Sequence, residues 1–120
     1  MVIKDLQKCA EITAGDNSIL RELLNPLKED IATRYSLAHA RVEPGEFTLA
    51  HRLKSAEVYY IMEGRGEMYV DQEREGISAG QAIYIPPGSI QKIQNTGMSD
   101  LIFLCIVDPA WKPEDEELVE

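Results

Sequence analysis

Three polar residues, His51, Glu57 and Gln91, have types and positions that could serve one small-molecule site. An imidazole beside a carboxylate can work as a general acid or base, and the same groups with an amide can surround a divalent cation. Because side chains alternate along a strand, His51 and Leu53 project to one face, and Glu57 can return to the same interior from the next strand. Gln91 follows the bend at residues 86–88, which would aim it inward. We expect the three side chains to meet inside a β structure.

The elements that must position them are short strands. From about Tyr35 onward, apolar or alternating runs are separated by turns rich in Gly, Pro and Asp. The runs are YSLAHARV, FTLAHRL, EVYYIM, EMYV, QAIYI, IQKIQ and LIFLCIV. This spacing is typical of an all-β sandwich or barrel. With 120 residues, of which 44% are hydrophobic, the chain can build the core of one domain.

The two ends of the chain are less regular. Residues 19–24, ILRELL, alternate like a strand but also fit about one and a half turns of helix ended by Pro26. We favour an extended edge strand, since six residues are few for a stable helix. The acidic end PEDEELVE is typical of a solvated tail or a short terminal turn. The predicted division is an N-terminal extension or edge strand over 1–34, a barrel over 35–107 and an acidic tail over 108–120.

Two stretches of the sequence resemble the paired signature motifs of the cupin family. The first motif is carried by Gly45, His51, Glu57 and Gly64, and the second by Gly80, Pro86, Gly88 and Asn95. The joint spacing is specific, and the resemblance covers roughly residues 35–107. It implies a small single-domain cupin, which is a double-stranded antiparallel β-barrel or jelly roll.

The resemblance also implies a metal site, which this sequence alters. Family members with three His and one Glu hold a divalent ion, often Mn, Fe, Ni, Cu or Zn. Here Leu53 stands where the family usually has a second His, and Gln91 stands where it has the last one. Leu53 is no donor and an amide oxygen is a weak one, so His51, Glu57 and Gln91 would hold a metal only with water completing the sphere.

Three functions remain open on the sequence. The first is a small-molecule-binding cupin with an interior His/Glu/Gln site, assisted by a divalent metal or working without one. The second is an enzyme of isomerase, epimerase or dioxygenase type acting on a small carbohydrate-like or carboxylic substrate, with His51 and Glu57 as catalytic groups. The third is a structural or regulatory homodimer with a vestigial site.

Two neighbouring residues bear on these alternatives. Tyr59 shares the parity of Glu57 and could add a hydroxyl to the site, although a barrel-filling aromatic ring is the commoner role. His39 is the other histidine of the chain. If EPGE closes a hairpin of residues 35–42 with residues 47–53, His39 lies opposite Ala50 and faces outward. His39 would then not supply the imidazole that is missing at positions 53 and 91.

Charge and composition limit the partners. A net charge of −9 with scattered basic residues disfavours nucleic acid and acidic membrane surfaces, and no apolar run has the length of a membrane span. Two widely separated cysteines without a secretory signal indicate reduced thiols and a cytoplasmic protein. EVYYIM and LIFLCIV are apolar on both faces, which predicts cover from the N-terminal segment or from a second subunit in a homodimer.

Overall fold

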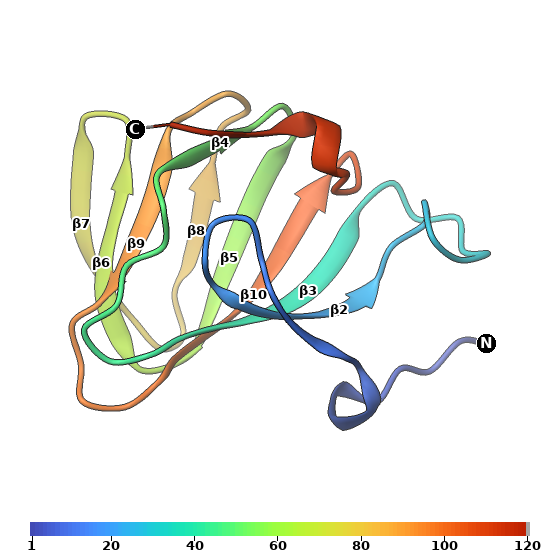
Figure 1. Ribbon diagram of the computed structural model, residues 1–120, viewed down its shortest axis with the longest axis horizontal. Helices are drawn as coiled ribbons and strands as arrows, with labels where there is room; N and C mark the ends of the chain where they lie inside the picture. The colour runs from blue at the N-terminus through green and yellow to red at the C-terminus, as the bar shows by residue number, and fades with distance from the viewer. Residues whose placement is uncertain (120) are drawn as a thin grey trace.

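The computed structural model describes residues 1–119, and within that range the chain is all-β, with two 3₁₀ turns and no α-helix (Figure 1). Two antiparallel sheets face each other, which confirms the jelly-roll expectation. The first sheet has the order β1 (Glu11–Thr13), β2 (Ile19–Leu24), β3 (Ser36–Val42), β10 (Leu101–Asp108), β5 (Ala56–Glu63), β8 (Ala82–Ile85). The second has the order β11 (Glu116–Leu118), β4 (His51–Leu53), β9 (Gln91–Asn95), β6 (Arg65–Val70), β7 (Glu73–Ser78). No helix of the described range is long and apolar enough to cross a membrane.

The core lies between the two sheets and follows the alternation of the strands. On β5, Glu57, Tyr59 and Ile61 are buried, whereas Tyr60 and Met62 are exposed. β10 and β9 alternate in the same way and bury every second residue. The inward parity expected for Glu57 is therefore the observed one.

Glycine turns fix where the strands end. The motif glycines Gly45, Gly64 and Gly88 all have positive φ, a backbone conformation that glycine adopts without steric strain. At Gly64 a Cβ atom would lie 2.8 Å from the carbonyl oxygen of Asp100, so a side chain is excluded by space as well as by φ. Gly88 donates its backbone N–H to the carbonyl of Leu53 at 2.8 Å. That bond ties the bend before β9 to the end of β4, next to the site.

The N-terminal segment forms a hairpin. ILRELL is a strand, as favoured, but β2 lies inside the sheet between β1 and β3, so the expectation of an edge strand was wrong. β1 takes the edge instead. The loop between the strands, residues 14–18, turns at Asn17 with a φ of 76° and passes in front of the barrel in Figure 1.

The acidic end of the chain is ordered against the barrel. We expected a solvated tail or a short turn, yet after the 3₁₀ turn Pro113–Asp115 the chain forms β11 and pairs with β4. Leu118 lies opposite His51 in this pairing. Trp111 is held by its backbone, since its N–H donates to the Ser36 hydroxyl and its carbonyl accepts from Asn25.

The predicted hairpin between residues 35–42 and 47–53 does not form. β3 pairs with β2 and β10 in the first sheet, whereas β4 pairs with β9 and β11 in the second. His39 still points to the outer side, because it lies opposite Leu104 and Arg21 and shares a pocket with Leu6 and Gln7. Its outward placement thus follows from the parity of β3 within the sheet, and burial under the N-terminal segment lowers its pKa.

Candidate functional site

A buried hydrogen-bonded cluster connects the two sheets. Gln91 on β9 donates its amide to Glu57 Oε1 on β5 at 3.0 Å, and its own oxygen accepts from the Tyr59 hydroxyl at 2.9 Å. All three side chains are almost fully buried. Tyr59 also packs its ring on Phe103, with 4.5 Å between ring centroids, so it fills the barrel and joins the polar cluster at once. Gln91 therefore holds Glu57 and Tyr59 in place across the interior.

The pKa of the Glu57 carboxyl is raised to about 8, which favours the neutral acid at pH 7. Burial is the main cause, the hydrogen bond from Gln91 opposes it, and the nearby Asp16 and Glu116 carboxylates add to the rise. Among the residues described, Glu57 Oε2 takes no hydrogen bond from the protein. A neutral acid with a free O–H can donate to a bound molecule or transfer a proton to it.

His51 lies directly opposite Gln91 in the pairing of β4 with β9 and is 3% exposed. Its Nδ1 lies 2.8 Å from the carbonyl oxygen of Leu49. A carbonyl only accepts, so Nδ1 carries the proton, and Nε2 is the nitrogen left for chemistry. Nε2 lies 3.7 Å from Asp16 Oδ2, too far for a hydrogen bond, and this carboxylate would stabilise an imidazolium.

Asp16 is a site residue that sequence reasoning missed. It sits in the loop between β1 and β2, where its Oδ1 accepts from the backbone N–H of Ser18 at 3.0 Å and from the hydroxyl at 2.6 Å. The carbonyl of Asp16 accepts from the Leu49 N–H, so the loop is fastened beside His51. The sequence Asp-Asn-Ser predicts a turn. Nothing in it indicates that the turn folds over the barrel.

These groups surround an interior cavity of about 240 Å³. Its wall includes Glu57, His51 and Leu53 from the barrel, but not Gln91, which lies behind Glu57 and Tyr59. The cavity therefore unites two of the three expected site residues and uses the third as support. The remaining wall is mostly apolar, with Leu20, Phe103, Cys105, Val107 and Trp111. A small, largely apolar hollow with a few buried polar groups is the usual form of a ligand site.

The residues do not fit a tight transition-metal site in this arrangement. The Gln91 oxygen accepts a hydrogen bond from the Tyr59 hydroxyl, and Gln91 does not line the cavity. Leu53 points into the cavity without a donor. Within residues 1–119 no three His, Cys, Asp or Glu side chains are grouped as metal ligands would be. His51 alone offers a free imidazole nitrogen there.

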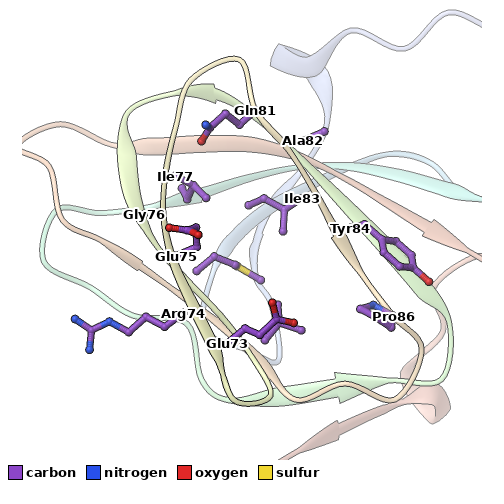
Figure 2. A pocket seen from close by; sticks show the side chains of 12 residues that line it. Glu73, Arg74, Glu75, Gly76, Ile77, Gln81, Ala82, Ile83, Tyr84 and Pro86 are labelled. Carbon is purple, nitrogen blue, oxygen red and sulfur yellow. The ribbon is translucent and has the colours of Figure 1, made fainter.

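A second, larger hollow of about 570 Å³ lies between β7 and β8, which are edge strands of the two different sheets. Figure 2 shows Ile77 and Ile83 pointing into it and Arg74 and Tyr84 pointing away. Its charged residues are exposed on β7. None of the expected site residues lines it.

Comparison with known proteins gives relatives of two kinds. "Uncharacterized protein MJ1618" of Methanocaldococcus jannaschii is 44% identical over 106 residues, covering 88% of this chain and 84% of that protein. An "Oxalate-binding protein" of Thermotoga maritima is 31% identical over 71 residues, covering 58% of this chain and 59% of that protein.

Solved structures share the architecture. The polyketide cyclase RemF of Streptomyces resistomycificus superposes with a TM-score of 0.82 at 20% identity, covering all of this chain and 86% of that one. At this identity the likeness concerns the fold. Residues 38–107, more than half of the chain and including the site strands β4, β5 and β9, match the cupin domain family, so the chain belongs to that family.

Proposed function

We propose that this protein binds a small organic molecule in the interior cavity without a metal, and that Glu57 and His51 are its polar contacts. The observation that carries the proposal is that two nearly buried side chains of the cavity wall, Glu57 and His51, each keep one polar atom, Oε2 and Nε2, without a hydrogen bond from the described residues. Neither atom is closed off from solvent, so a ligand in the cavity can reach and pair with both.

Thermal-shift screening of small carbohydrates, carboxylic acids, amides and amines, followed by calorimetry on the hits, tests the proposal. His51→Leu should abolish the ligand-induced rise in melting temperature, since it removes one of the two polar contacts. His39→Leu is the matched control, because His39 lies on the outer side of the same barrel. A ligand that stabilises His51→Leu and wild type equally would contradict the proposal.

A catalytic role for the same residues is the second candidate. It is favoured by the Glu57 carboxyl, whose pKa burial raises to about 8, and by His51 Nε2 on the same cavity wall, which would serve as the acid and the base of an isomerase or epimerase. Turnover of sugar-phosphate and keto-acid panels by wild type and Glu57→Ala would test it. Rates at background level for both proteins would count against catalysis. A dioxygenase would need a metal, so turnover of catechols is to be measured on the metal-loaded protein.

The metal-assisted version makes a separate prediction. It requires the Gln91 oxygen to leave Tyr59 and Glu57 to lose its proton. Metal analysis of protein grown with Mn, Fe, Ni, Cu and Zn should find far less than one ion per chain if our proposal holds. One tightly held ion per chain, lost in His51→Leu and kept in His39→Leu, would support the metal-assisted version instead.

We also propose that the protein is a homodimer through the outer face of the first sheet. Tyr60 and Met62 on β5 and Tyr84 on β8 are exposed there, beside partly buried aliphatic residues of β10. An apolar sheet face of this kind favours a second copy. Light scattering should give twice the chain mass, and Tyr60→Lys should give a monomer. A wild-type monomer at high concentration would contradict the dimer and leave the ligand proposal untouched.

A further inference from the structure

The cavity wall carries more acidic groups than basic ones. The acidic residues are Asp16, Glu22, Glu57 and Glu116, and the basic ones are Lys28 and His51. Glu22 and Lys28 form an ion pair at 2.8 Å and cancel each other. Burial raises the pKa of Glu57 to about 8, so this carboxyl adds little negative charge at pH 7. The two carboxylates Asp16 and Glu116 are left facing one imidazole, so the field inside the cavity is negative.

Both carboxylates are held in place with one oxygen uncommitted. Asp16 Oδ1 accepts a hydrogen bond from the Ser18 hydroxyl, and Asp16 Oδ2 lies 3.7 Å from His51 Nε2. Glu116 accepts the indole N–H of Trp111 on Oε1 at 3.2 Å. Its Oε2 takes no hydrogen bond from the described residues and lies against Gly15, where a Cβ atom would be 2.6 Å away. The loop before β2 and the strand β11 thus bring the two carboxylates together at the same end of the cavity.

We propose that this cavity selects a small ligand with a protonated nitrogen, such as an amine or an amidine, held by Asp16 and Glu116, and that it rejects dicarboxylates. The inference rests on the proposed ligand-binding function and names the ligand class. A cation gains Coulomb energy from both carboxylates in a poorly solvated hollow, whereas an anion is repelled by both. The uncommitted Glu57 Oε2, on a side chain only 5% exposed, adds an independent acceptor or donor in the same cavity.

The selecting residues lie outside the part of the chain that matches the family, residues 38–107. Asp16 and Glu116 are 100 positions apart, so the 71-residue match to the oxalate-binding protein cannot include both. The 106-residue match to the Methanocaldococcus protein is long enough to do so. The barrel therefore supplies the hollow, and the chain ends supply its charge. An oxalate ligand does not carry over from the shared barrel.

The rest of the wall limits the remainder of the ligand. Leu53, Phe103, Val107 and Trp111 offer apolar and aromatic surface. The cavity of about 240 Å³ equals the volume of roughly eight water molecules. A ligand of one ring or a short aliphatic chain with one cationic group fits this volume and these walls.

Three probes of one shape and different charge test the inference: benzamidine, benzamide and benzoate, titrated by calorimetry at pH 7 and low salt. Benzamidine should bind at least tenfold more tightly than benzamide, and benzoate and oxalate should not bind measurably. If all three benzene derivatives bind equally, or benzoate binds best, the charge inference is wrong while the ligand-binding function stands. If none of them binds or raises the melting temperature, the charge inference fails, and the broader ligand screen decides the ligand-binding function.

Charge-neutralising variants identify the residues responsible. Asp16→Asn and Glu116→Gln keep the shape of the side chain, and each should reduce the ratio of benzamidine to benzamide affinity by fivefold or more. Glu117→Gln is the matched control, since Glu117 is exposed and faces Arg52 at 3.9 Å on the other side of β11. Equal ratios in Glu116→Gln and Glu117→Gln would overturn the role of Glu116. An unchanged ratio in Asp16→Asn would overturn that of Asp16.

Discussion

The two hollows of this molecule differ in a way that volume does not reveal. The groove between β7 and β8 is more than twice as large as the interior cavity, about 570 Å³ against 240 Å³. Its charged residues, Glu73, Arg74 and Glu75, are all exposed to water (Figure 2). The interior cavity instead has a buried carboxyl and a buried imidazole with uncommitted atoms. Nearly buried polar side chains that keep an unpaired atom open to a cavity mark a site better than space does, because a ligand can complete their hydrogen bonds.

The largest expected effect is a pH-dependent loss of stability caused by Glu57. Its pKa of about 8 in the folded protein is above the value of 4.5 expected when the chain unfolds. Between these values the folded state keeps a proton that the unfolded state has lost. The contribution of this proton to the free energy of unfolding is therefore complete below pH 4.5 and disappears as the pH rises through 8. From pH 5 to pH 8 wild type should lose roughly 3 to 4 kcal/mol relative to Glu57→Gln.

Urea unfolding of both proteins across this pH range measures the difference. The groups that face Glu57 are Asp16, Glu116, His51, Tyr59 and Cys105, and all of them remain in the variant. Glu63 lies at the exposed end of the same strand, so the free energy of unfolding of Glu63→Gln should change with pH as that of wild type does. Parallel curves for wild type and Glu57→Gln would show that the Glu57 carboxyl is ionised in the fold, and the contrast between the hollows would weaken.

Removal of the amide that supports the site should have the next largest effect. Gln91→Leu leaves the Tyr59 hydroxyl and the Glu57 carboxyl without their shared partner, and each buried unpaired group costs about 1–3 kcal/mol. We expect a loss of about 2–4 kcal/mol in the free energy of unfolding. Gln94→Leu, on the outward parity of the same strand, should change it by no more than about 0.5 kcal/mol. Similar losses in both variants would mean that the cluster contributes nothing particular.

The fold was easier to predict from the sequence than the site. Alternating runs and turn residues are local signals, so the all-β barrel, the strand character of ILRELL and the positive φ of Gly45, Gly64 and Gly88 could all be anticipated. Strand pairing is a long-range property. The supposed hairpin of residues 35–42 with 47–53 failed because β3 and β4 belong to different sheets. The C-terminal strand β11 was not predicted for a similar reason, since its partner β4 is more than 60 residues away in the sequence.

For the site, motif spacing brought His51, Glu57 and Gln91 into one interior but could not assign their positions within it. Gln91 lies behind the wall, and Asp16 and Glu116 complete the wall from segments without a motif. The spacing of the motif residues predicts the barrel. The two terminal segments cover the open end of the barrel, and no local pattern in these segments predicts that they fold back over it.

A matched pair of cavity-filling variants tests which hollow binds ligand. Ala38 lines the interior cavity, and Ile83 lines the outer groove and points into it, so Ala38→Leu and Ile83→Phe each add three carbon atoms to one hollow only. Ala38→Leu should weaken benzamidine binding at least tenfold, which is about 1.4 kcal/mol. Ile83→Phe should leave it unchanged. The opposite result in calorimetry would transfer the ligand site to the outer groove and reverse the comparison.

The smallest expected effect concerns the contact between the two chain ends. Gly15→Ala puts a methyl group where Glu116 Oε2 now lies, and the flexible carboxylate can move away at little cost in stability. The free energy of unfolding should change by less than about 0.5 kcal/mol. Benzamidine affinity should fall by two- to fivefold while benzamide affinity stays constant, because only the charge is displaced. If the affinity for both probes fell together, Gly15 would matter for the shape of the cavity, and Glu116 would have no special part in choosing the charge of the ligand.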